Sequence, residues 1–244
     1  MLRYAVLLPL AMLSDANVYS FEKLGKCTSN IGGITINWQV AHSDFIWEII
    51  EKQAYTPRPE FKIYDNYTVI DAGANIGTFT RYAGLMAPKG KVVAIEPNTH
   101  LFGILRRNVA LNRLSNVQLV NAALTDSTSA VTFYQAKSGG SLNRNVYRIR
   151  LVEERRSVSP ETVFSTFGID SIDLFKIRIE GSEFQLFRNP SFLQRTKRIV
   201  IGTDPRLGDI ALVLNLLIKA GFRVRTSPAY LAKGQLYIYA TRDC

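Results

Sequence analysis

The residues of this 244-residue chain that are best suited to chemistry lie around one short turn. The segment Asp71-Ala-Gly-Ala-Asn-Ile-Gly77 follows a short apolar run and precedes a helical pattern. Gly73 and Gly77 let the backbone approach a ligand closely, and an asparagine such as Asn75 tolerates left-handed geometry better than most residues. The start of the following helix offers free N–H groups, which here suit a carboxylate. The turn therefore predicts a ligand site.

An acidic residue at a suitable distance makes the ligand more specific. Glu96 ends the next apolar run, nineteen residues after Gly77, where a carboxylate can accept hydrogen bonds from both hydroxyls of a ribose. The dinucleotide fingerprint does not fit, because Asn75 and Thr78 stand at its second and third glycine positions, and no Walker A lysine follows. Turn and acid together predict a site for a nucleoside cofactor that lacks a diphosphate.

The elements that must hold these residues alternate along the chain. Apolar runs typical of buried strands cover 68–71, 91–96, 116–121, 172–180, 198–202, 221–225 and 235–240, and helical patterns cover 76–86, 98–112 and 209–220. This alternation predicts an α/β fold, with a mostly parallel sheet and helices on both faces. We expect residues 1–66 to be an N-terminal extension, with a helix over 43–53 that begins at Ser43 or Asp44. Residues 67–244 then form the domain, with a long insertion over 124–170.

Five segments of the chain resemble the FkbM family of S-adenosylmethionine-dependent methyltransferases. They are Asp71–Gly77, Val93-Ala-Ile-Glu-Pro-Asn98, Leu105-Arg-Arg-Asn108 with Asn112, Asn121-Ala-Ala-Leu124 and Lys176-Ile-Arg-Ile-Glu-Gly-Ser-Glu183. The resemblance covers roughly residues 40–205, and its first and last segments are the specific ones. It implies a class I methyltransferase (Rossmann-like) fold with seven strands, the last inserted antiparallel, and S-adenosyl-L-methionine as the cofactor. It also implies cofactor contacts: Asp71, Gly73, Asn75 and Gly77 at the methionine part, Glu96 at the ribose, and Asn121 or its neighbours at the adenine.

One position departs from the family pattern. The family motif usually reads Lys-Ile-Asp-Val-Glu-Gly, and here Arg178 stands in place of the aspartate. On a regular strand Lys176, Arg178 and Glu180 share one face, where three charges are costly unless they are paired. Two hypotheses follow: Glu180 pairs with Arg178 inside the fold, or Glu180 lies beside the methyl group as a base. Glu183 and Asp204 are lesser candidates for that base.

The loss of the aspartate puts in doubt any scheme that uses two carboxylates or a metal, and it could mark altered or lost activity. We expect no metal site, because the two cysteines and two histidines of the chain cannot build a Cys/His zinc site.

The net charge bears on the acceptor. Lys and Arg number 30 against 20 Asp and Glu, a formal net charge of +10, with basic residues gathered over 144–156 and 188–242. The leading hypothesis is O-methylation of a hydroxyl on a saccharide or other small metabolite, and phosphorylated or anionic saccharides would suit these arginines. An RNA methyltransferase that uses the same basic segments is the alternative. A catalytically silent module that binds a partner is the second alternative.

The composition indicates the class of protein, and the N-terminal segment bears on its cellular location. An apolar content of 47% excludes a disordered or collagen-like chain. Residues 3–16 resemble a short signal peptide, and the alternative is an apolar N-terminal segment that packs on the domain. The apolar run is too short to span a membrane, and no later segment approaches a span. We expect a cytoplasmic protein with reduced thiols, and the oligomeric state stays open.

Overall fold

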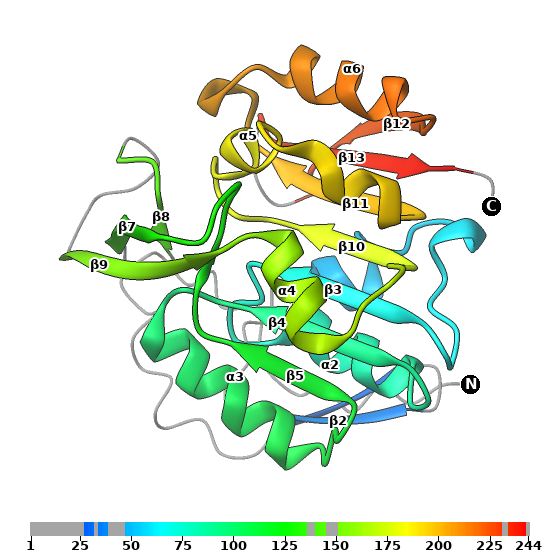
Figure 1. Cartoon of the computed structure of the whole chain (residues 1–244). Helices are drawn as coiled ribbons and strands as arrows, with labels where there is room; N and C mark the ends of the chain where they lie inside the picture. The colour runs from blue at the N-terminus through cyan, green and yellow to red at the C-terminus, as the bar shows by residue number, and fades with distance from the viewer. Residues whose placement is uncertain are drawn as a thin grey trace.

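The fold is built on a seven-stranded mixed sheet (Figure 1). The computed structural model describes residues 27–31, 34–38, 47–135, 140–144, 151–230 and 234–242. The sheet has the order β12-β13-β11-β10-β3-β4-β5. Its strands are β3 (Thr68–Ala72), β4 (Lys91–Ile95), β5 (Val117–Val120), β10 (Leu174–Ile177), β11 (Arg198–Thr203), β12 (Arg223–Pro228) and β13 (Leu236–Thr241). Strand β13 lies between β11 and β12 and is antiparallel to both, as predicted for the last strand.

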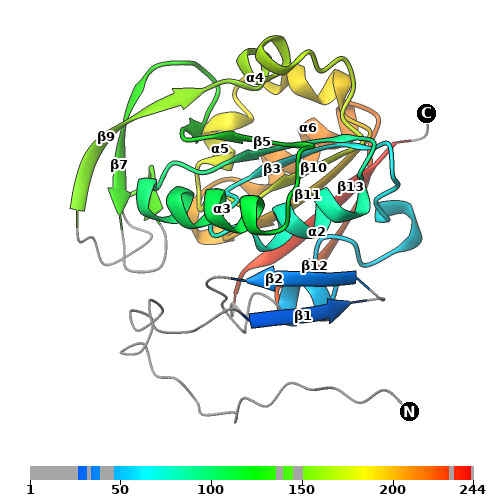
Figure 2. The same ribbon diagram turned by 90° about the horizontal axis from the view of Figure 1, so that it is seen from below.

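Helices cover both faces of this sheet, which confirms the predicted layers (Figure 2). One face packs against α2 (Thr78–Met86) and α3 (Thr99–Leu111). The other packs against α4 (Pro160–Phe167), α5 (Glu183–Leu186), the 3-10 helix Pro190–Arg195 and α6 (Ile210–Lys219). Local capping fixes several helix starts, because the side chains of Asn98, Ser159 and Asp209 accept backbone N–H bonds in the first turns of α3, α4 and α6.

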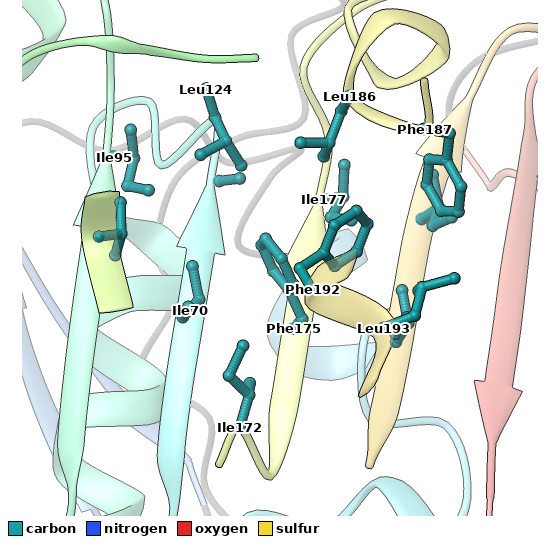
Figure 3. Close-up of a cluster of buried hydrophobic side chains, with 14 of the residues drawn as sticks. Ile70, Ile95, Leu124, Ile172, Phe175, Ile177, Leu186, Phe187, Phe192 and Leu193 are labelled. Carbon is teal, nitrogen blue, oxygen red and sulfur yellow. The ribbon is translucent and has the colours of Figure 1, made fainter. Parts of the chain in front are cut away.

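The larger part of the core lies between the sheet and α4, α5 and α6 (Figure 3). Phe192 is at its centre and meets the rings of Phe175 and Phe187 edge-on, with centroids 5.6 and 5.5 Å apart. Each of these rings is almost fully buried. This packing holds β10 and β11 in place, and the carboxyl ends of the sheet strands carry the candidate site.

The long insertion contains strands of its own. They are β6 (Ala123–Leu124), β7 (Ala130–Gln135), β8 (Gly140–Ser141) and β9 (Leu151–Val158), which form a second sheet in the order β6-β9-β7-β8. Strand β7 and strand β9 are its longest pair and run antiparallel. Part of the basic segment, 145–150, lies outside the described residues. The insertion stands beside the carboxyl ends of β4 and β10 (Figure 1).

The N-terminal region differs from expectation. Strands β1 (Cys27–Ile31) and β2 (Ile34–Trp38) form an antiparallel hairpin, and the helix expected over 43–53 is one short π-helix, Trp47–Glu51. Its expected start lies outside the described residues. Gln53 has a left-handed φ of 51°, which ends the helix, and the short 3-10 helix Pro59–Phe61 follows. Ile49, Tyr55 and their neighbours nevertheless pack into the core beside α2.

Several predictions concern membrane spans, location and domain boundaries. No helix within the described ranges is long and apolar enough to cross a membrane. Residues 1–16 and Cys244 lie outside these ranges, so the cytoplasmic location, the fate of the N-terminus and the state of the thiols stay predictions. The division into an extension over 1–66 and a domain over 67–244 also stays a prediction.

Candidate active site

A cavity of about 200 Å³ opens at the carboxyl ends of β3, β4 and β10. The β3–α2 turn forms one wall, the end of β4 a second, and the segment after β10 a third. Phe133, Ser141 and Leu142 of the insertion also line it, so the insertion contributes to the cavity. Ligands of open α/β sheets bind at this edge.

The glycine turn after β3 serves two different purposes. Gly73 lines the cavity with φ 75°, and a Cβ there would lie 1.9 Å from the carbonyl oxygen of Arg178, so no larger residue fits beside β10. Gly77 has φ 87°, but the space beside it is filled by Leu105 of α3, since a Cβ at Gly77 would lie 2.5 Å from the Leu105 side chain. Gly77 does not line the cavity, and its absent side chain permits α2 and α3 to pack, so its predicted contact with the cofactor stays a prediction.

Asp71 is completely buried and acts through a neighbour. Its carboxylate accepts hydrogen bonds from the Thr80 hydroxyl at 2.6 Å and from Lys176 Nζ at 2.8 Å. Lys176 also donates to the carbonyl oxygens of Ala72 and Gly73, and it lines the cavity whereas Asp71 does not. Direct contact between Asp71 and the cofactor is therefore not what the geometry favours. The pair instead fixes the end of β3 against β10.

Glu96 directly follows β4, and its side chain contacts the turn between β3 and α2. One carboxylate oxygen accepts the Asn75 N–H at 2.8 Å, and the other accepts the Asn98 N–H at 2.9 Å. Burial raises the pKa of Glu96 to about 7, although both backbone hydrogen bonds oppose that change. Asn75 itself has a left-handed φ of 54° and lines the cavity, as the turn predicted. The carboxylate keeps lone pairs for two further donors, which is what a ribose diol requires.

The wall next to Glu96 is apolar. Ile95, Pro97, Leu101 and Leu124 line it, and they offer a surface for a flat purine ring. Asn121 does not line the cavity; its amide donates to the carbonyl oxygens of Glu96 and Pro97 and so fixes their loop. Its neighbours Ala123 and Leu124 do line the cavity, and the prediction for the adenine named Asn121 or its neighbours.

Thr78, the first residue of α2, carries a polar atom that a bound cofactor could contact. Thr78 lines the cavity, and its hydroxyl is buried without a hydrogen-bond partner among the described residues. A buried hydroxyl without a partner is costly, so a polar ligand is expected to satisfy it. A carboxylate for the ribose, an apolar wall for the adenine and free polar groups at the turn fit S-adenosylmethionine.

The charged residues after β10 do not follow a regular strand. The strand expected over 172–180 stops at Ile177, and Glu180 and Gly181 turn the chain with φ of 54° and 94°. Glu180 lines the cavity and one of its carboxylate oxygens lies 3.6 Å from Arg178 Nε. The two hypotheses for Glu180 are thus compatible, because the same side chain pairs with Arg178 and borders the cavity.

Glu183 and Asp204 do not line the cavity, in contrast to the prediction that made them candidate bases. Glu183 is buried, where it accepts hydrogen bonds from the Thr203 hydroxyl at 2.5 Å and the Gly181 N–H at 2.8 Å, and burial raises its pKa to about 7. Asp204 bonds the N–H and the guanidinium of Arg206, which lower its pKa. Both carboxylates therefore support the backbone that follows β10 and β11.

Several residues of the cavity carried no signal in the sequence. Ile49 and Tyr55 come from the N-terminal region and Gln235 directly precedes β13, and all three line the cavity. None belongs to a motif, and only the fold brings them to the same edge of the sheet. Among the described residues, no group of three or more His, Cys, Asp or Glu side chains is arranged to hold a metal ion.

Comparisons with known proteins identify the family of the chain. The model of the methyltransferase FkbM domain matches residues 71–224. Methyltransferase 1 of Beauveria bassiana (strain ARSEF 2860) is 27% identical over 198 residues, which cover 72% of this chain and 80% of that protein. Methyltransferase sdnD of Sordaria araneosa is 26% identical over 211 residues, covering 72% and 82%.

The fold is shared with a solved structure, the fibrillarin pre-rRNA processing protein of Methanococcus jannaschii. It has a TM-score of 0.54 and 13% identity, and the match covers 95% of this chain and 86% of that one. The class I methyltransferase fold is thereby confirmed. Together with the family match, the site leads to one conclusion: the chain belongs to the FkbM family of S-adenosylmethionine-dependent methyltransferases.

Proposed function

We propose that the protein methylates a hydroxyl group of an uncharged saccharide or other small metabolite and forms a methyl ether. The observation that carries the proposal is the carboxylate of Glu180, which borders the cavity with 23% of its side chain exposed. It lies at the end of the sheet where ligands bind, and a hydroxyl is a weak nucleophile near neutral pH that benefits from a base.

The cofactor half of the site is assigned to the residues described above. Glu96 would hold the ribose, Leu101 and Leu124 the adenine, and the turn at Gly73 and Asn75 the methionine part. Direct roles for Asn121 and Asp71 are replaced in this proposal by indirect ones. When bound, S-adenosylmethionine supplies a methyl group on a positively charged sulfur, which is already a good electrophile.

The chain's own contribution to the reaction is then mainly orientation and proton removal. Glu180 would accept a hydrogen bond from the acceptor hydroxyl and so align its oxygen. As the new carbon–oxygen bond forms and the methyl–sulfur bond breaks, the hydroxyl proton would pass to the Glu180 carboxylate, and the sulfur would leave as a neutral thioether. Release of that proton to water after the ether leaves would restore the site.

The charges that line the cavity favour an uncharged acceptor over a phosphate-bearing one. Both cations of the described lining are already paired, Lys176 with Asp71 at 2.8 Å and Arg178 with Glu48 and Glu180 at 3.4 and 3.6 Å. An RNA phosphate or a phosphorylated saccharide would have to displace these carboxylates, which is costly for buried pairs. The paired cations of the cavity therefore favour a small-molecule acceptor over RNA.

The acceptor class can be identified with methyl-labelled S-adenosylmethionine. The protein is incubated with RNA, protein, glycan and small-molecule fractions of an extract, and with a panel of methyl glycosides and simple alcohols. We expect label in glycan, glycoside or small-molecule products that resist mild base, as methyl ethers do. Label confined to RNA or protein, or found in no fraction, would contradict the proposal.

Replacement of the proposed base tests the mechanism. Glu180→Gln should lower kcat about 100-fold or more, because a positioned base contributes about 10²–10⁴-fold. The affinity for S-adenosylmethionine, measured by calorimetry, should change little. Glu60→Gln, at an exposed position, is the matched control. Wild-type kcat in Glu180→Gln would show that another group removes the proton.

A further inference from the structure

The Arg178 guanidinium contacts four polar side chains of the described residues in addition to Glu180. Its Nη1 donates to the hydroxyl of Tyr237 at 2.9 Å and lies 3.4 Å from both a Glu48 carboxylate oxygen and the Tyr55 hydroxyl. Its Nη2 donates to the side-chain oxygen of Gln235 at 3.2 Å. The planar guanidinium is therefore fixed along two of its edges.

The support behind Arg178 is buried and rigid. Glu48 is completely buried, and its second carboxylate oxygen accepts the Tyr237 hydroxyl at 2.6 Å. Tyr55 packs edge-on against Tyr237, with ring centroids 5.6 Å apart. Glu48, Tyr237 and Arg178 thus form a closed set of contacts, in which each polar group contacts the other two.

The stem of Arg178 also has a place made for it. A Cβ at Gly202 of β11 would lie 3.2 Å from Arg178 Cδ, so the arginine lies across the one residue of β11 that leaves it room. Arg178 itself lines the cavity. The Arg178 side chain therefore contacts the buried Glu48 at one end and the cavity wall at the other, in one fixed conformation.

Arg178 also contacts two residues that line the cavity, Glu180 and Gln235. Glu180 lies against Arg178 Nε at 3.6 Å, and Gln235 binds Nη2; both line the cavity. Because arginine only donates hydrogen bonds, the oxygen of Gln235 faces Arg178 and its amide N–H groups are left for another partner. Arg178 therefore presents an acceptor group, Glu180, and a donor group, Gln235, to the same cavity.

We propose that Arg178 is a positioning residue that builds the subsite for the methyl acceptor from Glu180 and Gln235. The subsite takes a vicinal diol or a similar pair of adjacent oxygens: one hydroxyl donates to Glu180 and is methylated, and the neighbouring oxygen accepts from Gln235. The inference rests on the proposed O-methylation and names the substrate class of that site. It also assigns a role to residues outside the range 71–224, because Glu48, Tyr55, Gln235 and Tyr237 all lie beyond it.

The decisive experiment compares acceptor kinetics with cofactor affinity in matched variants. The acceptor is the panel glycoside or alcohol that the wild-type protein methylates, together with its analogue that lacks the neighbouring hydroxyl. Arg178→Lys keeps the charge and loses the planar group; we expect kcat to fall about 100-fold, as misplacement of a reacting group by about 1 Å can do. The dissociation constant of S-adenosylmethionine should stay within about twofold. Arg107→Lys, exposed on α3, is the control.

A second variant tests the diol. Gln235→Met removes the donor together with the oxygen that accepts from Arg178 Nη2, while Arg178 keeps its contacts with Tyr237 and Glu48. KM for the diol should rise about five- to tenfold with a small change in kcat, as for one lost hydrogen bond. With the deoxy analogue, wild type and Gln235→Met should give the same KM, a result that a merely structural role of Gln235 would not produce. Should Arg178→Lys fail to fold, Tyr237→Phe keeps the ring, removes the hydroxyl between Glu48 and Arg178, and should lower kcat by a smaller factor.

The possible outcomes separate this inference from the proposed function. Failure of the wild-type protein to methylate any hydroxyl acceptor counts against the O-methylation and against the diol subsite built on it. Transfer to a hydroxyl acceptor with equal kcat in wild type and Arg178→Lys counts against the role of Arg178 alone. Equal losses of cofactor affinity and of kcat would make Arg178 a general structural residue and overturn the inference.

Discussion

Cofactor affinity should depend on pH through one carboxylate, Glu96. Burial raises the pKa of Glu96 to about 7, so near neutral pH the free protein is a mixture of the protonated and ionised forms. Only the ionised form accepts both backbone hydrogen bonds, from Asn75 and Asn98, and both ribose hydroxyls. S-adenosylmethionine should therefore bind more tightly as the pH rises through 7.

The size of the effect follows from this pKa. With a pKa of about 7, roughly one tenth of Glu96 is ionised at pH 6 and roughly nine tenths at pH 8. The dissociation constant should fall about tenfold over that interval. Glu96→Gln removes the titration and leaves one backbone N–H facing an amide. We expect it to cost about 2 kcal/mol at pH 8, or about 30-fold in affinity, because hydrogen bonds to a charged group are lost.

Calorimetric titration of both proteins with S-adenosylmethionine between pH 5.5 and 8.5 measures these quantities. The amino group of the cofactor also titrates in this range, but it does so equally with both proteins, so the ratio of the two dissociation constants isolates Glu96. That ratio should grow about tenfold from pH 6 to pH 8 and then level off. A ratio independent of pH would refute the claim that burial brings Glu96 into the neutral range. A ratio near one throughout would refute its assignment to the ribose.

Two further predictions concern the backbone and the buried acid beside the site. Gly73→Ala should lower the free energy of unfolding by more than about 2 kcal/mol, because its Cβ meets the Arg178 carbonyl in addition to the strain of a positive φ; Gly168→Ala, with φ 60° and open space, should cost only about 1 kcal/mol in the same urea titration. Burial raises the pKa of Glu183 in the folded state to about 7, so the folded protein binds more protons than the unfolded one between about pH 4.5 and 7, and stability falls as the pH rises through that range. Glu183→Gln should therefore flatten the decrease in unfolding free energy between pH 5.5 and 7.5, and an unchanged slope would show that Glu183 does not bind the extra proton.

Sequence spacing placed Gly73, Asn75 and Glu96 at the same edge of the sheet, where all three line the cavity, because this part of the site is local. The turn at Asp71–Gly77 and the acid at Glu96 each follow directly from a parallel strand, and the ends of adjacent parallel strands meet at one edge. Spacing along the chain is then a good guide to proximity in space. Spacing does not determine which way a residue faces: Asp71 turns to Lys176, Gly77 to Leu105, and Asn121 to the carbonyl oxygens of Glu96 and Pro97.

The acceptor half could not be predicted in the same way. A two-residue period placed Lys176, Arg178 and Glu180 on one face, but β10 ends at Ile177 and the left-handed φ of Glu180 breaks the period. Glu183 was a reasonable candidate by position, yet the turn directs its carboxylate to Thr203. Periodicity holds only while the dihedral angles repeat, and functional loops at strand ends are where they cease to do so.

The remaining residues of the acceptor half come from opposite ends of the chain. Glu48 and Gln235 are separated by nearly the whole sequence, and both bind one guanidinium. No local pattern marks either of them, since a single acid or amide in a mixed segment is most often a surface residue. Arg178 could be singled out as unusual, but its partners became visible only when the sheet brought residues 47–55 and 234–237 together.

The net charge of +10 takes on a different meaning once these partners are known. Sequence reasoning connected the basic residues with the acceptor, yet the cations that line the described cavity, Lys176 and Arg178, are each held by a buried carboxylate. Glu96 and Glu180 line the same cavity and add negative charge. Arginines such as Arg188 and Arg223 are exposed and do not line it. We therefore expect the acceptor subsite proposed for Glu180 and Gln235 to suit a polyol better than an anion.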